Sequence, residues 1–450
     1  MGDRAARFRG TMAVMTDRAP LAPTVRVLAT VSFLTDVASE MIYPLLPLFL
    51  STVLGTTAAG LGVIEGVAES VSALLRLPSG WWSDRIGRRK PLVVIGYGLA
   101  AVARPLIGLA QTTGQVLAIR VTDRFGKGVR SAPRDALIAD AVAPEHRGLA
   151  YGLHRAADSA GAVVGPLLAW ALLHFGWVEL RTLFLWAAVP GLLALAMVVW
   201  WVREIPAPGR VNGVAESNGA SLNGASPLAS VVSSSAAASA VVGAEAVGAD
   251  RALLDRVDGT LGSVFWRFLG VLFLFTLAAS SDAFLLLRAS SLGVSVSQIP
   301  ILWALLHVVK SGTNIVGGRL SDRIGRRPLI LGGWAVYALT YLGFGLATTT
   351  WQIWALFLVY GLYFGATEGV EKALVADLVP EDRRGVAFGW FNAALGVGAL
   401  PASIGFGIAW ERLGAATAFC AAAAVAGAAT LLLAVAVPAS PQQQREPGRS

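Results

Sequence analysis

The segment GWWSDRIGRRKPL at residues 80–92 recurs as GRLSDRIGRRPLI at residues 318–330, and the stretch SDRIGRR is identical in both copies. Each copy brings an acidic residue, a glycine and several arginines together, whereas the sequence on either side is strongly apolar. Repetition of a charged segment within an apolar chain indicates two halves of common design. The sequences around the two copies indicate what those halves contain.

The composition of the chain predicts a membrane protein. Its 450 residues are 55% hydrophobic and only 14% charged, whereas soluble domains carry about 25% charged residues. The net charge of +8 is typical of cytoplasmic loops in such a chain, and no basic domain with stacking aromatic residues stands apart, so we expect no nucleic-acid binding. Cys420 is the only cysteine and can form neither a disulfide framework nor a metal cluster. Residues 1–25 lack an apolar core, so we expect no cleavable signal sequence.

Membrane-spanning helices, which need about 20 mostly apolar residues, are expected at twelve places in the chain. These lie near residues 26–50, 59–82, 91–111, 115–138, 149–173, 182–202, 263–287, 298–318, 329–348, 352–376, 385–409 and 414–437. A segment rich in Ser, Ala, Gly and Asn separates the sixth helix from the seventh and has little reason to fold. The expected parts are an N-terminal tail (1–25), an N-terminal six-helix bundle (26–202), a flexible linker (203–262), a C-terminal six-helix bundle (263–437) and a C-terminal tail (438–450).

Arginine and lysine are distributed unevenly among the expected loops. They gather in the N-terminal tail, in both SDRIGRR loops and at Arg383 and Arg384, whereas the loops at 51–58, 112–114 and 346–351 contain neither residue. Positively charged loops mark the cytoplasmic side of a membrane. We therefore expect a multi-pass protein of a cell inner membrane with both termini, both SDRIGRR loops and the linker in the cytoplasm.

A second repeated segment falls later in each half. Residues 136–152 read ALIADAVAPEHRGLAYG, and residues 373–389 read ALVADLVPEDRRGVAFG. The halves are thus repeats of six helices in the same orientation. With two copies of the loop pattern G-x-L-a-D-r-x-G-r-r/k, the sequence resembles the major facilitator superfamily of secondary transporters over residues 26–437. The resemblance implies an all-α fold of twelve transmembrane helices in two pseudo-symmetric halves, with helices 1, 4, 7 and 10 around a central cavity.

The resemblance also implies a gating role for the SDRIGRR loops, since in the family they help to hold the cytoplasmic side in one conformation. A loop that serves only to set topology is the alternative. The residues concerned are Gly80, Asp84, Arg85, Gly87, Arg88, Arg89, Gly318, Asp322, Arg323, Gly325, Arg326 and Arg327. Gly161, Gly165 and Pro166 partly match a helix 5 signature of antiporters, although close helix packing explains the same residues.

Charged side chains in the centre of a bilayer cost about 2.5–3.5 kcal/mol each, so their positions indicate function. Asp36 and Glu40 lie four residues apart on one face of the first helix, near mid-membrane. Two carboxylates so close together cannot both ionise cheaply, and a proton-coupled transporter needs such a proton-binding group. A static ion pair with the basic fourth helix is the alternative. The proton-coupling candidates are Asp36, Glu40, Asp158 and Glu368.

Other charged residues are candidates for contact with substrate or for structural pairing. The substrate-cavity candidates are Arg120, Asp123, Arg124, Lys127, His307 and Lys310. A structural bond between helices is the alternative for His307. We expect Glu65 and Glu69 to pair with Arg76 or with the eleventh helix, and a role in coupling is the alternative. We also expect Arg134–Asp135 and Glu371–Lys372 to form ion pairs between the halves on the cytoplasmic side.

The sequence lacks the motifs of ATP hydrolysis, zinc proteolysis and nucleophilic catalysis, so we expect no enzyme, no cofactor and no metal. It predicts a monomeric transporter that works by alternating access and exports a small organic solute in exchange for protons. The basic fourth helix favours an anionic or metal-chelate-like solute. The alternatives are proton-coupled import by symport and a transport-inactive membrane sensor or scaffold.

Overall fold

The computed structural model describes residues 22–86, 88–143, 146–202 and 261–437, and the structural statements below concern these residues. They form helices and contain no strand. Most of the expected linker, at 203–260, lies outside the described residues. The same is true of most of the N-terminal tail and of residues 438–450.

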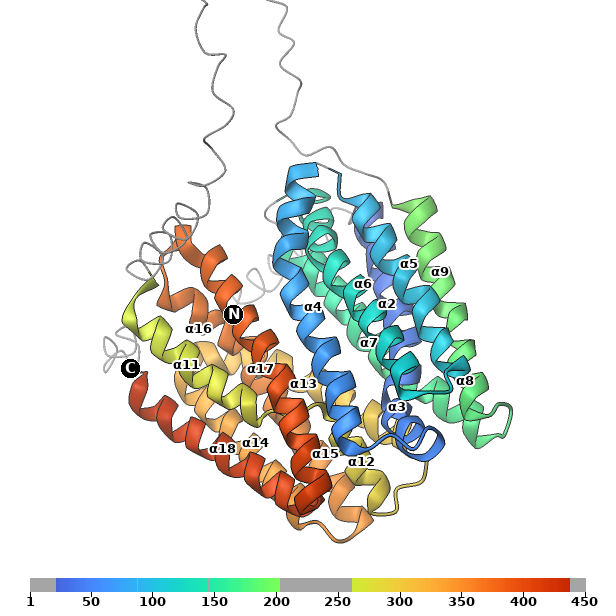
Figure 1. Cartoon of the computed structure of the whole chain (residues 1–450). Coiled ribbons are helices and arrows are strands. Elements are labelled where there is room, and N and C mark those ends of the chain that lie inside the picture. The colour runs from blue at the N-terminus through green and yellow to red at the C-terminus, as the bar shows by residue number, and fades with distance from the viewer. Residues whose placement is uncertain (1–21, 87, 144–145, 203–260, 438–450) are drawn as a thin grey trace, which may run out of the picture.

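The first half of the molecule, from Pro23 to Trp201, supplies the blue-to-green helices of Figure 1. Its helices are α2 (Pro23–Ile42), η1 (Tyr43–Leu45), α3 (Leu46–Leu48), η2 (Phe49–Val53), α4 (Ala58–Ile86), α5 (Lys90–Leu106), η3 (Ile107–Leu109), α6 (Thr113–Asp140), α7 (Arg147–His174), α8 (Leu180–Trp186) and α9 (Ala188–Trp201). Pro44 and Pro47 lie in η1 and α3, where the first membrane segment departs from regular α-helix, because proline cannot donate the backbone hydrogen bond of a helix.

The second half, from Ser263 to Ala436, repeats this arrangement in the yellow-to-red helices of Figure 1. Its helices are α11 (Ser263–Ala278), α12 (Asp282–Ser291), α13 (Ile299–Ile324), α14 (Arg326–Leu346), α15 (Thr350–Thr367), α16 (Val370–Leu378), η5 (Glu381–Arg383), α17 (Arg384–Leu413) and α18 (Ala415–Ala436). Gly325 joins α13 directly to α14 with φ 93°, a backbone conformation that glycine adopts without strain. The second SDRIGRR copy is thus the turn between these helices.

Eleven segments of the described chain are long and apolar enough to cross a membrane. The fourth expected segment, α6, is 28 residues long but carries eight charged residues. It is tolerated because several of these charges are paired inside the protein, as described below. The expectation of an all-α fold of membrane helices is confirmed.

The two halves lie closest at the lower end of Figure 1 and diverge toward the upper end. We call the upper end, where the α4–α5 and α13–α14 turns lie, the Arg-rich end, and the lower end the opposite end. Contact between the halves is closest along α4 and α17, where glycines of each helix touch backbone of the other. Ser70 of α4 also donates a 2.6 Å hydrogen bond to the carbonyl oxygen of Gly396. These contacts involve Ala58 to Leu74 of α4, and α4 continues to Ile86 beyond them.

Two membrane segments of the second half are interrupted near the middle, where the sequence predicted single helices. The seventh segment breaks between Ala278 and Asp282, where Ser281 caps α12 by accepting a 3.3 Å hydrogen bond from the Ala283 N–H. The tenth breaks at Glu368 and Gly369. Discontinuous helices expose polar backbone, which membrane proteins tolerate where it is buried in protein or lines a cavity.

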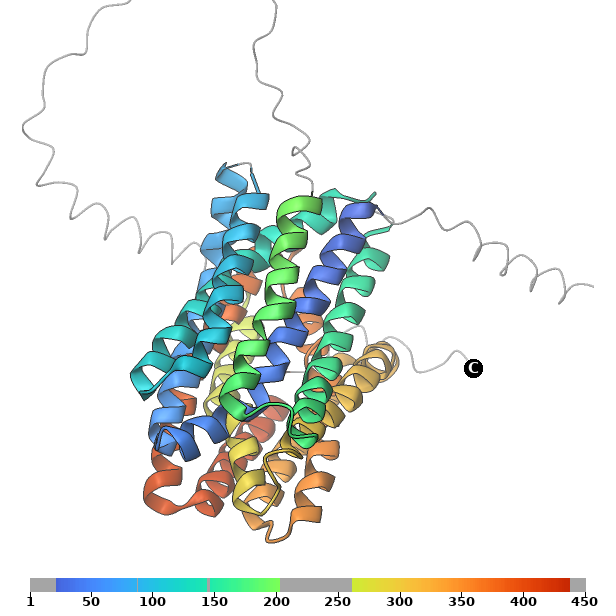
Figure 2. The same ribbon diagram turned by 90° about the vertical axis from the view of Figure 1, so that its right-hand side faces the viewer.

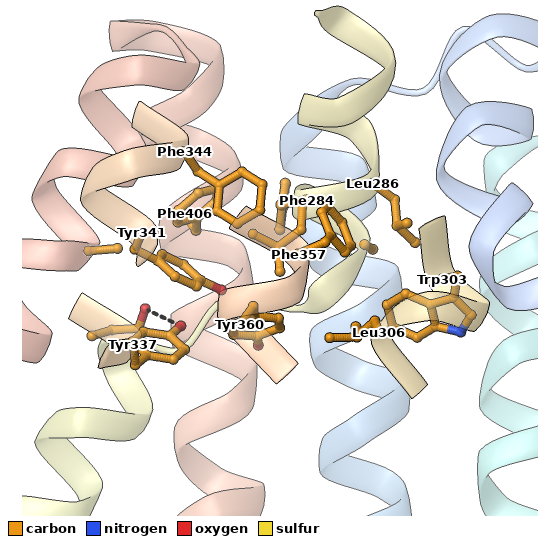
Figure 3. Close-up of a cluster of buried hydrophobic side chains, with 14 of the residues drawn as sticks. Phe284, Leu286, Trp303, Leu306, Tyr337, Tyr341, Phe344, Phe357, Tyr360 and Phe406 are labelled. Carbon is orange, nitrogen blue, oxygen red and sulfur yellow. Dashed lines mark hydrogen bonds between the residues drawn. The ribbon is translucent and has the colours of Figure 1, made fainter. Parts of the chain in front are cut away.

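Aromatic side chains fill the core of the second half, as Figure 3 shows. Tyr337 and Tyr341 stack with ring centroids 4.2 Å apart, and the Tyr360 hydroxyl donates a 2.7 Å hydrogen bond to Asp282. Tyr341 and Ser280 join their hydroxyl groups across 3.1 Å. This cluster holds the interrupted seventh segment in place and leaves the first half to supply most of the cavity charges.

Candidate functional site

A cavity of about 510 Å³ lies between the halves and is lined by residues of both. A second hollow of about 420 Å³ shares Arg155, Glu368 and Lys372 with it and extends to Asp322 and Arg326 at the Arg-rich end. At the other end α4 and α17 are in contact and close the space between the halves, whereas the second hollow extends it toward the Arg-rich end. The helices that bring these residues together are far apart in the sequence but packed as neighbours in the bundle (Figure 2).

Most of the residues proposed from the sequence lie in the cavity wall. The lining includes Asp36, Glu40, Arg124, Lys127, Asp158, His307, Lys310 and Glu368. Arg120 and Asp123 do not belong to it, because both are buried in ion pairs within the first half.

A polar cluster closes the inner end of the cavity and joins the two halves. Trp303 of α13 donates a 2.7 Å hydrogen bond from Nε1 to Glu40 of α2, and His307 Nε2 lies 3.9 Å from the same carboxylate. The Trp303 ring also packs on Tyr43, with centroids 5.2 Å apart. Ser281 of the second half donates a 3.4 Å hydrogen bond to Glu65 of the first. The carboxylate of Glu40 thus bonds across the halves rather than to the fourth helix.

The acidic pair of α4 is held by the basic pair of α6. Arg120 donates to Glu65 across 2.8 Å, and Arg124 lies 3.1 Å from Glu69. The expectation that these glutamates pair with Arg76 or with the eleventh helix was wrong. Residues four apart lie on one face of a helix, so two neighbouring helices with opposite charges at that spacing match each other. That match was present in the sequence and was missed.

Arg104 of α5 and Asp123 of α6 form a second buried ion pair that the sequence did not predict. Their side chains are 6% and 3% exposed, and Arg104 Nε lies 2.9 Å from Asp123. Arg104 also donates a 2.8 Å hydrogen bond to the carbonyl oxygen of Thr35 on α2. The pair therefore ties three helices of the first half together beside the cavity.

Replacing Arg104 by leucine is expected to lower the free energy of unfolding by about 3–5 kcal/mol, because the Asp123 carboxylate loses its closest buried partner. The thermal unfolding of the purified chain in detergent measures this, with exposed Arg412→Leu as the control. The double variant Arg104→Leu/Asp123→Leu is expected to recover most of the loss, because apolar pairs replace buried ion pairs well. An unchanged midpoint in Arg104→Leu would show that the pair is not stabilising.

Three carboxylates of the first half gather in the cavity wall. Asp36 and Glu40 of α2 and Asp158 of α7 line it together with Lys127 and Arg104. The structure shows no ion pair between Asp36 and the described residues of α6 within salt-bridge distance, so the alternative of a static pair is not what it contains.

The second of these carboxylates, Asp158, lies in a polar group that the sequence did not predict. It accepts a hydrogen bond from Ser32, and His154 Nε2 lies 3.9 Å away. Neither ring nitrogen of the buried His154 has a hydrogen-bond partner among the described residues. A carboxylate beside a hydroxyl and an imidazole can exchange a proton with the cavity.

Glu368 has a different environment from the other proton-coupling candidates. It lies 3.1 Å from Lys310 and 3.4 Å from Arg155 of α7. Two cations beside one carboxylate favour its charged form. Glu368 therefore has the geometry of an ion-pair partner between the halves.

One prediction about ion pairs between the halves was wrong, namely that Arg134–Asp135 and Glu371–Lys372 form them. Arg134 bonds to its own neighbour Asp135, and Glu371 accepts a 2.8 Å hydrogen bond from Trp334 within the second half. The halves are apart at this level because the cavity opens here.

The two repeated segments contact each other within each half. Arg89 of the first SDRIGRR copy pairs with Asp140, and Arg326 of the second pairs with Asp377. Arg327 donates to the carbonyl oxygen of Ala434, and Arg85 lies over the Trp81 ring. Arg88, Asp322 and Arg323 are exposed. Gly318 borders the 420 Å³ hollow. Gly87 and the side chain of Asp84 are not among the residues and side chains that the structure describes. A gating role for these loops stays a prediction.

The small residues of the fifth membrane segment lie against the first. A Cβ atom on Gly165 would lie 2.7 Å from the carbonyl oxygen of Val37, and one on Gly161 would lie 2.9 Å from Cβ of Asp36. Pro166 follows within the same helix and is buried. Gly161 and Gly165 therefore let α7 approach α2 at the level of the carboxylates.

Two six-helix halves with a charged cavity between them, accessible from one end, define a polytopic membrane carrier. A model of the Major Facilitator Superfamily matches residues 28–309 and, in a second match, residues 267–450. An uncharacterized MFS-type transporter of Methanocaldococcus jannaschii is 30% identical over 397 residues, covering 87% of this chain and 89% of its own length. The chain belongs to the Major Facilitator Superfamily, and it is a transporter, not an enzyme, in a membrane that it crosses many times.

Other relatives and solved structures agree with this assignment. An uncharacterized protein of Mycobacterium tuberculosis is 27% identical over 387 residues, covering 86% of both chains. The multidrug resistance protein MdtH of Escherichia coli is 28% identical over 160 residues, which is 36% of this chain and 39% of MdtH. A POT family transporter in complex with 5-aminolevulinic acid has a TM-score of 0.71 at 12% identity, covering 93% of this chain and 96% of its own. A D-xylose-proton symporter has a TM-score of 0.64 at 18% identity, with 93% and 97% covered, so both show the fold alone.

Proposed function

We propose that this protein is a proton-coupled secondary active transporter of a small organic solute that works by alternating access. The observation that carries the proposal is the cavity between the halves, with Asp36, Glu40 and Asp158 in its wall and one end closed by contacts between the halves. Rocking of two halves around a central site is how carriers built from repeats expose it to each side in turn. The volume of about 510 Å³ suits a small organic molecule.

The Arg-rich end lies in the cytoplasm in this proposal, because positively charged loops stay on that side of a membrane. The structure then represents the state open to the cytoplasm. The protein acts as a monomer in the cell inner membrane with both termini in the cytoplasm, and the two six-helix halves are the parts that move during transport.

Two directions of coupling are candidates. Export in exchange for protons is favoured by the likeness of 160 residues to the multidrug resistance protein MdtH. It is also favoured by the partial antiporter signature of Gly161, Gly165 and Pro166. Import together with protons is favoured by the charge of the cavity, where cations outnumber carboxylates.

The test uses purified full-length protein in liposomes with an imposed pH gradient and a trapped pH dye. A panel of drugs, sugars, organic acids and chelates is added in turn, and solute content and internal pH are both followed. A transported solute is expected to move protons and to accumulate against its own gradient, with collapse of both on addition of a protonophore. Solute that only equilibrates and never moves protons would overturn the proposal.

A further inference from the structure

The cavity wall carries more positive than negative charge. Nine arginine or lysine residues and five aspartate or glutamate residues line it. Charges of one sign in a cleft with low-dielectric walls concentrate ions of the opposite sign. The question is which of these cations are already neutralised by the protein itself.

Five of the nine cations have a carboxylate partner. Arg104 pairs with Asp123, Arg124 with Glu69 and Arg134 with Asp135, whereas Arg155 and Lys310 share Glu368. A sixth, Arg130, is buried and donates to the Gly96 carbonyl oxygen beneath the Tyr97 ring. In the described chain, the side chains of Arg76, Lys127 and Lys372 have neither a salt bridge nor a hydrogen bond.

These three residues come from both halves. Arg76 of α4, Lys127 of α6 and Lys372 of α16 all line the same cavity. We call Arg76, Lys127 and Lys372 the cation triad. Like charges around one cavity are unfavourable until an anion lies between them.

We infer that the solute is a small organic anion with at least two negative charges, which the cation triad binds between the two halves. The inference rests on the proposed function and names the substrate class of that same cavity. A guanidinium recognises carboxylate, phosphate or sulfonate oxygens in a bidentate manner, and the two ammonium groups act as point charges. An anion of one charge would leave the triad mostly uncompensated.

The same geometry determines how protons couple to the anion. Asp36 shares the cavity wall with Lys127, Arg104, Glu40 and Asp158. A carboxylate that takes up a proton stops competing with the solute for Lys127 and stops repelling it. Proton and anion therefore favour each other's binding, and the reciprocity of linked binding makes the effect equal in both directions.

Asp158 contributes in the same direction. It faces Arg134 of α6, its own helix neighbour His154, Ser32 of α2 and Asp36. Its protonation removes a negative charge from the cavity wall, which Asp158 lines. Solute and proton thus move together, which is symport rather than exchange.

The test measures binding to the purified full chain in detergent with strong-acid probes, whose charge does not change between pH 5.5 and 8. The dianion is naphthalene-1,5-disulfonate, the monoanion is naphthalene-1-sulfonate and the cation is tetraethylammonium, all at constant ionic strength. We expect the dianion to raise the thermal midpoint most, and to do so more at pH 5.5 than at pH 8. Lys127→Gln and Lys372→Gln are each expected to weaken its binding by about tenfold or more, the loss typical of one charge-assisted bond.

The matched control is Arg412→Gln, which removes an exposed cation outside the cavity and should leave dianion binding unchanged. Equal stabilisation by the cation or the monoanion, or unaltered binding in both lysine variants, would overturn the inference. The two proposals fail separately. Proton-coupled uphill transport of a neutral or cationic solute would refute the anion alone, whereas dianion binding without any uphill transport would refute proton-coupled transport alone.

Discussion

Alanine in place of Gly62 is expected to shift the protein away from the state open at the Arg-rich end and to slow transport. A Cβ atom on Gly62 would overlap the carbonyl oxygen of Ser403 on α17. Other glycines at this helix crossing are packed as closely. A Cβ atom on Gly407 would overlap the carbonyl oxygen of Ala58, and a Cβ atom on Gly66 would lie 3.1 Å from Leu400. Overlap of backbone with backbone is relieved only when α4 and α17 separate, which opens the opposite end.

The size of this shift follows from the cost of overpacking, about 1–3 kcal/mol. That cost changes the equilibrium between the two open states by about 5- to 150-fold. The measurement places one cysteine at Asn314 in the cavity wall, after Cys420→Ser, and compares its modification by a membrane-impermeant maleimide from each side. Modification from the Arg-rich end is expected to slow by that factor and modification from the opposite end to quicken.

The control for Gly62→Ala is Gly405→Ala on the facing helix α17, at a position where a Cβ atom meets no heavy atom within 4 Å. It should leave both labelling rates and transport unchanged. If Gly62→Ala labelled and transported like the unaltered chain, contact between α4 and α17 would not close the opposite end.

The fold was predictable because its determinants are repeated and local. Two copies of SDRIGRR, two copies of the ALIAD and ALVAD segments and long apolar runs each point to the same six-plus-six arrangement. The structure adds that the two repeated segments bind each other, through Arg89 with Asp140 and Arg326 with Asp377. The charged α6 was also recognised, although its composition alone does not qualify it as a membrane span.

The partners of the charged residues were less predictable, because they depend on how each helix is rotated against its neighbours. Opposite charges four residues apart on α4 and α6 could have revealed the pairing of Glu65 with Arg120. No such spacing relates Glu40 to Trp303, since that bond crosses the halves and depends on the state of the transporter. The same dependence explains why the ion pairs expected from Arg134 and Glu371 are absent from this arrangement of the described residues, which is open at the Arg-rich end.

Replacing Asp36 by asparagine is expected to abolish proton movement coupled to the solute while preserving solute binding. Asp36 lies in the cavity wall together with Asp158, Glu40 and Lys127. Its negative charge attracts a proton and repels an anionic solute. Asparagine has the shape of the protonated acid but cannot release a proton. The variant therefore always resembles the protonated form, which favours binding of an anionic solute. Its cavity cannot return to the other side of the membrane without solute bound.

Three measurements in liposomes distinguish this uncoupling from simple loss of folding. Uphill accumulation under a pH gradient should fall to the level of protein-free liposomes, whereas exchange of labelled for unlabelled solute should continue and solute affinity should no longer vary with pH. Glu179→Gln, an exposed carboxylate outside the cavity, should leave all three unchanged. Proton movement that persists in Asp36→Asn but vanishes in Asp158→Asn would move the coupling site to Asp158. Loss of exchange together with accumulation would instead mean that Asp36 is needed for the solute to bind or for the halves to move.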